Sequence, residues 1–178
     1  MIESIAAAAR LPQVDRAQAA VIGEAESRVA LALLQQLGDD DWQCPTDCTE
    51  WDVRTMVSHL VAECEDSIRM RTMLRREFAG RRRYPDRSGV DAHMAAQVDD
   101  HHAETGPELV KRFALLWRRA VRARLRRPGA LRRIKIDLGI PGAPRVPFSF
   151  LVDLIYNRDL WMAPARPGPC HRPTIRHR

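Results

Sequence analysis

The sequence has few lysines and no long hydrophobic run. Only Lys111 and Lys135 are lysines, so the 29 basic residues minus these 2 leave 27 arginines. No apolar stretch reaches the length needed to cross a bilayer, which excludes a predicted membrane span. Residues 1–10 carry acidic Glu3 and no basic residue ahead of their alanines, unlike a secretory signal. We therefore expect a cytoplasmic protein that does not use a membrane as a partner.

The four cysteines also form no recognisable framework. A chain of this length with so few cysteines does not resemble a small secreted disulfide domain. Cys44 and Cys48 are separated by three residues, not by the two of a zinc knuckle, and the remaining cysteines, Cys64 and Cys170, form no second pair at matching spacing. We predict free, reduced thiols.

The net charge of +6 and the pI near 9.8 raise the question of a nucleic-acid partner. The excess is modest for 178 residues, and G+C-rich coding explains an arginine bias. We interpret the basic residues on and after one predicted helix as a solvated face, and no recognition motif accompanies them; they are Lys111, Arg112, Arg118, Arg119, Arg122, Arg124, Arg126, Arg127, Arg132, Arg133 and Lys135. Composition therefore does not favour nucleic-acid binding.

Length and composition predict one globular domain with a real core, since 45% of the residues are hydrophobic and no internal repeat is visible. We assign residues 18–162 to this domain and residues 1–17 to an N-terminal segment. Residues 163–178 are rich in proline and arginine and predict a disordered tail.

Hydrophobic spacing predicts helices in the first half of the domain. An apolar stripe indicates a helix over residues 18–37, and it consists of Val21, Ala25, Val29, Ala32, Leu33 and Leu37. Thr49 and Asp52 resemble a capping box that opens a second helix, predicted to run unbroken over residues 50–79. A weaker helix is predicted from residue 90 to about residue 102.

The second half of the domain predicts two more principal helices. Thr105 and Glu108 form another capping signature, and the helix they open carries an apolar face and ends before Pro128. Glycines and prolines in residues 131–147 predict a connection with one short extended piece over residues 134–138. The last helix is predicted over residues 147–162. Together these elements predict an all-α, irregular four-helix bundle with a long crossover, with Trp51, Trp117 and Trp161 as core aromatics.

Two segments carry a family resemblance. Residues 48–60 read Cys-Thr-Glu-Trp-Asp-Val-Arg-Thr-Met-Val-Ser-His-Leu, and residues 151–162 read Leu-Val-Asp-Leu-Ile-Tyr-Asn-Arg-Asp-Leu-Trp-Met. Both resemble the DinB-like, mycothiol-dependent maleylpyruvate isomerase family, and with the residues between them the likeness covers residues 21–162. The resemblance implies a DinB-like helical bundle with a three-residue metal site.

The resemblance also implies which residues hold the metal. His59 matches the first ligand, Asp159 matches the acidic ligand, and Ala163 occupies the position of the third ligand, a histidine. Imidazole and carboxylate suit zinc or a similar divalent ion, but two ligands would hold it loosely. Glu63, one turn after His59, is an alternative third ligand, although we expect a solvated charge there. Neighbouring His101 and His102 point apart on a helix and predict a polar helix end.

The tail suggests why the third ligand is missing. When permitted codons for residues 163–175 are read one base out of register, they can encode His-Arg-Leu-Asp-Leu-Ala-Arg-Ala-Thr-Gly-Arg-Pro, which resembles the family's continuation and begins with the missing histidine. We hypothesise a frameshifted terminus. Resequencing around codon 163 tests this, and codons incompatible with that reading would refute it.

The function implied by the resemblance is a metal-dependent isomerase or transferase that adds a thiol cofactor such as mycothiol to a small electrophilic substrate. Two other classes stay open: a non-catalytic remnant or binding protein that keeps the bundle, which Ala163 favours, and a basic nucleic-acid-binding module, whose affinity would fall steeply with salt. A homodimer also stays open.

Overall fold

The computed structural model describes residues 14–46, 48, 50–138, 142 and 144–162, and the predicted tail lies outside these ranges. The described chain is almost entirely helical, which confirms the all-α prediction. Its elements are α2 (Arg16–Leu34), η1 (Asp39–Gln43), α3 (Val53–Ile68), α4 (Met70–Arg83), α5 (Gly89–Asp99), α6 (Gly106–Arg126), α7 (Gly129–Arg133), β1 (Lys135–Ile136), β2 (Val146–Pro147), α8 (Phe148–Phe150), η2 (Leu151–Ile155) and α9 (Tyr156–Met162). None of the described helices is long and apolar enough to span a bilayer.

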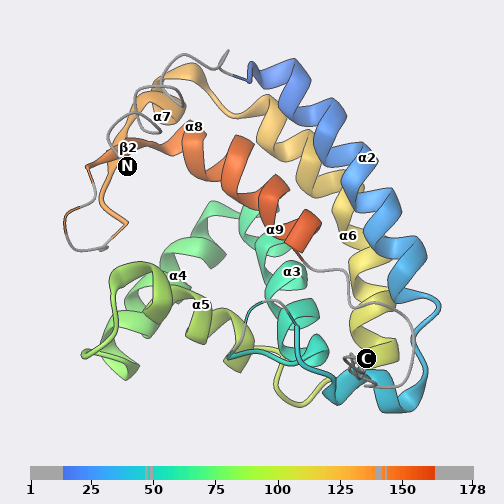
Figure 1. The fold of residues 1–178 in the computed structure, drawn as a ribbon. Coiled ribbons are helices and arrows are strands. Elements are labelled where there is room, and N and C mark those ends of the chain that lie inside the picture. The colour runs from blue at the N-terminus through green and yellow to red at the C-terminus, as the bar shows by residue number, and fades with distance from the viewer. Residues whose placement is uncertain (1–13, 47, 49, 139–141, 143, 163–178) are drawn as a thin grey trace, which may run out of the picture.

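Four helical segments form the bundle. Helices α2 and α6 run side by side in opposite directions (Figure 1), and α3 packs directly on α6. The η2 and α9 segments pack on α2, and α9 also contacts α3. Helices α4 and α5 pack on each other as a separate pair, and α5 also contacts α3. The arrangement places α9 and α5 on different sides of α3, so side chains from both can reach residues of α3.

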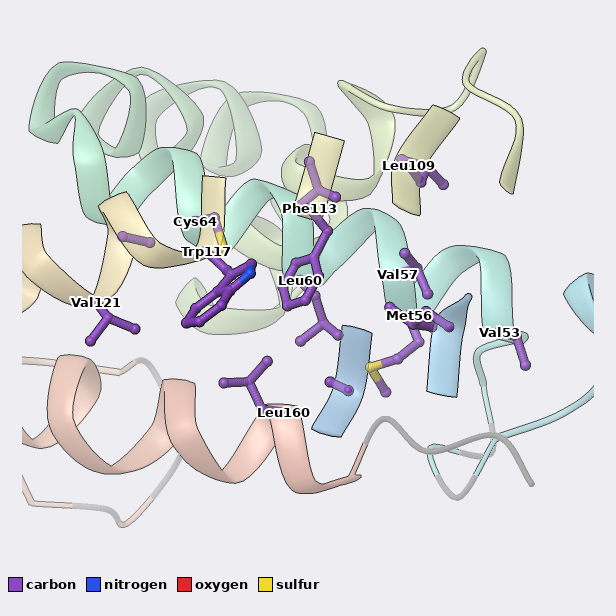
Figure 2. Packing of buried hydrophobic residues seen from close by; sticks show 14 of the residues in the cluster. Val53, Met56, Val57, Leu60, Cys64, Leu109, Phe113, Trp117, Val121 and Leu160 are labelled. Atoms are coloured by element: carbon purple, nitrogen blue, oxygen red, sulfur yellow. The ribbon is translucent and has the colours of Figure 1, made fainter. Parts of the chain in front are cut away.

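The core lies along the seam between α3 and α6. Buried side chains at helical spacing face each other across this seam, and Leu160 of α9 points toward them (Figure 2). From α3 they are Val53, Met56, Val57, Leu60 and Cys64, and from α6 they are Leu109, Phe113, Trp117 and Val121. The predicted helix after Thr105 is confirmed, including its capping box with Glu108.

The buried face of α2 differs from the predicted stripe. Val21 is 69% exposed and Val29 is 57% exposed, whereas the helix buries Ala19, Gly23, Ser27, Ala30 and Leu34. These residues are mostly small, which lets α2 approach its neighbours closely. A Cβ atom on Gly23 would lie 2.8 Å from Oδ1 of Asn157. The stripe prediction was wrong because close packing selected small residues rather than large apolar ones.

The helix predicted over residues 50–79 is broken at Arg69, which adopts an extended conformation with φ −130° and ψ 99°. The break turns α4 back toward α3, so that Nη1 of Arg76 donates to Oδ1 of Asp66 at 2.7 Å. In an unbroken helix these two residues would lie about 15 Å apart along the axis. Helix α3 begins at Val53, and Asp52 is its N-cap, accepting from the backbone N–H of Thr55 at 2.7 Å. Thr49 of the predicted capping box lies outside the described residues.

The crossover after α6 holds more structure than predicted. Residues 129–133 form the short helix α7, and β1 pairs with β2 in antiparallel register, Ile136 opposite Val146. The predicted solvated face is wrong at Arg124, Arg127 and Arg132, which are buried. Arg127 donates through Nη2 to the carbonyls of Asp66 and Ser67 at the C-terminal end of α3. A positive charge at this end of a helix interacts favourably with the helix dipole. Arg132 is paired with Asp153.

Two smaller predictions also need correction. His101 is buried, with Nδ1 2.7 Å from Glu104 and Nε2 3.3 Å from Glu65, whereas the neighbouring His102 is exposed. His101 is therefore an interior residue rather than part of a polar helix end. Cys48 and Cys64 are free as predicted, but Cys44 is disulfide-bonded.

Candidate metal centre

Helix α3 supplies two of the three donor groups at the centre of the molecule. His59 and Glu63 are one turn apart, so both side chains leave the same face of the helix. Their side chains are 5% and 6% exposed, and His59 Nε2 lies 3.4 Å from Glu63 Oε1. The expectation that Glu63 is a solvated charge was therefore wrong. The structure makes it a buried partner of the imidazole.

Helix α9 supplies the third group. Asp159 is buried, and its Oδ2 lies 3.8 Å from His59 Nε2. One donor atom from each of His59, Glu63 and Asp159 can be chosen such that all three lie within 4.8 Å of one another. The structure thus brings together the two residues that the sequence nominated, and adds Glu63 to them.

The segment before Asp159 is unusual, because η2 is a π-helical turn. A π turn inserts an extra residue into a helix and rotates everything beyond it around the helix axis. Asn157 fixes the segment by donating from Nδ2 to the carbonyls of Ala19 and Asp153, both at 2.9 Å. Asp159 follows directly and faces α3. Such turns are concentrated at functional sites.

The two oxygens of Asp159 have separate partners. Arg158 donates to Oδ1 from Nε at 3.0 Å and from Nη2 at 2.7 Å, while Oδ2 faces His59. On the other side of the imidazole, Nδ1 of His59 lies 2.8 Å from Oε1 of Gln97 on α5. Every polar atom of the imidazole and of the Asp159 carboxylate therefore has a partner, and His59 Nε2 is the atom directed at the carboxylates.

The charges of the cluster shift one another's pKa values. Burial raises the pKa of the Glu63 carboxyl to about 7, although His59 opposes this. Burial alone would lower the pKa of His59, but Glu63 and Asp159 outweigh it and raise that pKa to about 10. Burial would raise the pKa of Asp159, yet hydrogen bonding to His59 and the charges of His59 and Arg158 lower it. Without a metal ion, the imidazole holds a proton between the carboxylates.

A cavity of about 870 Å³ opens on this cluster and includes His59, Arg158 and Asp159 in its wall. Trp51 forms part of the same wall, and its ring centroid lies 5.1 Å from that of His59. The prediction of Trp51 as a core aromatic is therefore incomplete, since the residue is only half-buried and lines the cavity. Met56, Met94 and Val98 add apolar surface, and the free thiol of Cys48 also lines the cavity.

The three donors fit a divalent cation. Imidazole nitrogen and carboxylate oxygen are both ligand types that zinc takes, and three protein ligands are the number that a catalytic zinc site uses when one position is left for water or substrate. The proton that His59 holds on Nε2 is the one that an ion would replace. Position 163, where the sequence lacks the expected histidine, lies outside the described residues.

The described chain is a helical bundle that holds a buried His–Glu–Asp cluster beside a cavity. This arrangement defines a DinB-like domain with a candidate metal site. More particularly, residues 24–162 match the model of the mycothiol maleylpyruvate isomerase N-terminal domain, and the chain belongs to this family. No curated protein and no solved structure matches the chain.

Proposed function

We propose that this protein is a metal-dependent, thiol-cofactor-dependent isomerase or transferase that acts on a small electrophilic substrate. In this proposal His59, Glu63 and Asp159 hold a zinc ion, and mycothiol is the thiol. The observation that carries the proposal is the convergence of three buried donor atoms within 4.8 Å of one another, where two of the residues, His59 and Asp159, also line an open cavity. Family membership supports the choice of thiol.

Zinc bound in this position would lower the pKa of a coordinated thiol and so supply a thiolate nucleophile at neutral pH. The residues around the cluster are suited to present that thiol to a substrate. Trp51, Met56 and Met94 offer an apolar wall, and the exposed side chains of Arg87 and Arg158 lie at the cavity surface, where they can meet an anionic group. Burial of His59 and Glu63 keeps bulk water away from one side of the cluster.

The test is the metal content of protein purified without chelator. We expect one equivalent of zinc in the wild type and none in His59→Ala. His102→Ala is the matched control, because His102 is an exposed histidine outside the cavity wall. Conversion of a small unsaturated keto acid by the zinc protein and mycothiol then tests the reaction. The thiol titre stays constant if the protein is an isomerase, which releases the thiol again, and falls if it is a transferase, which leaves the thiol on the product. A folded wild type that contains no zinc and takes up none would refute the proposal.

The second candidate is a non-catalytic remnant that keeps the bundle, and Ala163 in place of the third family ligand favours it. It differs from the first candidate in predicting a stable protein that neither binds zinc nor converts the keto acid. The nucleic-acid module is less supported, because three of the arginines assigned to its surface are buried. Binding to duplex DNA at low salt would revive it.

A further inference from the structure

We propose that Gln97 and Asp66 are positioning residues that fix the tautomer of His59, so that its Nε2 atom is left for the metal ion. This inference rests on the proposed function, since it concerns how the His59 imidazole of the same site is kept in the tautomer that binds the metal ion. It assigns a role to two side chains that do not touch the cavity and that neither sequence pattern singled out.

The three residues form a chain of buried hydrogen bonds from α3 through α5 and back to α3. Nδ1 of His59 lies 2.8 Å from Oε1 of Gln97, and Nε2 of Gln97 donates to Oδ2 of Asp66 at 2.7 Å. Their residue exposures are 4%, 1% and 0%. No water competes for these groups at such burial, so the partners within the protein determine which atoms donate and which accept.

The direction of the chain follows from Asp66. Its Oδ1 accepts from Nη1 of the buried Arg76 at 2.7 Å, and a carboxylate paired with a guanidinium is an acceptor only. Gln97 must therefore turn its NH2 group toward Asp66 and its carbonyl oxygen toward His59. A carbonyl accepts and cannot donate, so His59 must carry a proton on Nδ1. The neutral imidazole that binds an ion then has its lone pair on Nε2, the atom that faces Glu63 and Asp159.

Arg76 holds Asp66, the last residue of this hydrogen-bonded chain, in place. Arg76 also donates to the Ala62 carbonyl at 3.0 Å, to Glu65 at 2.6 Å and to Asp100 at 2.9 Å, so it joins α3, α4 and the end of α5. The break at Arg69 is what brings Arg76 to this place. Because the same arginine holds Asp66 and α5, the Gln97 amide is fixed in position as well as in direction.

The experiment compares wild-type protein with Gln97→Met, which keeps the volume of the side chain and removes both hydrogen-bonding groups. Zinc affinity is measured by competition with a chelator, and the protonation of the His59 nitrogens is read by ¹⁵N NMR. We expect zinc-loaded wild type to carry a proton on Nδ1 and none on Nε2. We expect Gln97→Met to bind zinc about 10- to 100-fold more weakly, as for other outer-sphere partners of ligating histidines.

His93→Gln is the control, because His93 also reaches Asp66, with Nε2 3.0 Å from Oδ2, but does not contact His59. This variant removes a different partner of Asp66, and we expect it to leave zinc affinity unchanged. Equal zinc affinity in wild type and Gln97→Met would overturn the inference while the proposed function stands.

Two further outcomes are decisive, and the first does not depend on how well Gln97→Met folds. Zinc-loaded wild type with a proton on Nε2 of His59 would overturn the inference. Wild type that binds no zinc, but whose Nδ1 proton is protected and is lost in Gln97→Met, would support the hydrogen-bonded chain and contradict the proposed function.

Discussion

Nε2 of His59 on α3 lies 3.8 Å from Oδ2 of Asp159 on α9, and Glu63 completes the group from the next turn of α3. Two helices far apart in the sequence thus bring an imidazole and two carboxylates together, and the imidazole and the Asp159 carboxylate line an open cavity. Left without an ion, such a cluster is costly, because burying charged groups costs several kcal/mol each before pairing offsets it. A divalent cation bound there would stabilise it.

Glu63→Gln should lower zinc affinity by more than about 100-fold. A loss of about 100-fold is the upper limit for removing a side chain that only supports a ligand, and removing a ligand itself should cost more. The amide keeps the shape of the side chain but brings no negative charge. Glu65→Gln is the matched control, because Glu65 lies on the same helix and pairs with Arg76 instead. Chelator competition measures both. Equal losses in the two variants would mean that Glu63 acts through fold stability alone.

Ala163→His should strengthen zinc binding, because residue 163 follows Asp159 by four positions and corresponds to the family's histidine ligand. If Glu63 is the third ligand in the wild type, the added histidine should rescue much of the affinity lost in Glu63→Gln. Zinc titrations of Glu63→Gln and of the double variant test this. A double variant that binds no better than Glu63→Gln alone would contradict it.

The unfolding free energy should fall as pH rises through the titration of His93. Burial would lower its pKa, but hydrogen bonds to Asp66 and Glu77 outweigh burial and raise it to about 9 from 6.5. Between these values the folded state binds more protons than the unfolded state. The stabilisation is therefore complete below pH 6.5 and is lost as pH rises through 9, by about 2 to 3 kcal/mol.

The measurement for His93 is urea unfolding of the metal-free protein from pH 6 to pH 9.5. His93→Gln should make this part of the stability profile less steep, and the slope that remains comes from His59, whose pKa is also raised. His102→Gln, at an exposed site, should leave the profile unchanged. An equally steep profile in His93→Gln would show that another group is responsible.

Gly80→Ala should destabilise the protein by about 1 to 3 kcal/mol through overpacking. A Cβ atom at this position would lie 2.3 Å from the carbonyl oxygen of Ala92, so α4 and α5 would have to separate. Gly38→Ala is the control, since the nearest atom to its Cβ would lie 3.8 Å away. Thermal unfolding compares them, and equal melting temperatures would contradict the close contact of the two helices.

Much of the fold could be predicted from local patterns. The capping signature of Thr105 and Glu108 and the apolar face after it placed α6 correctly, because a cap and a periodic face are encoded within a few residues. The break at Arg69 could not be predicted in this way. It depends on Arg76 reaching Asp66 across a turn, which is a tertiary contact with no local signature.

The candidate site was predictable to a similar extent. His59 and Asp159 came from motif resemblance, and their approach across the interior is a property of the bundle. Glu63 was visible at one turn from His59, but the sequence could not reveal that this position is buried. Gln97 had no signal at all, because its importance depends on the hydrogen bonds that it makes to His59 and to Asp66 in the folded protein.

The central claim is that His59, Glu63 and Asp159 share one cation, and anomalous diffraction at the zinc edge from crystals of the zinc-soaked protein tests it most directly. We predict a single strong peak in this cluster, about 2.0 to 2.2 Å from His59 Nε2 and from an oxygen of each carboxylate. An empty cluster, with the imidazole still paired with the two carboxylates, would contradict the claim.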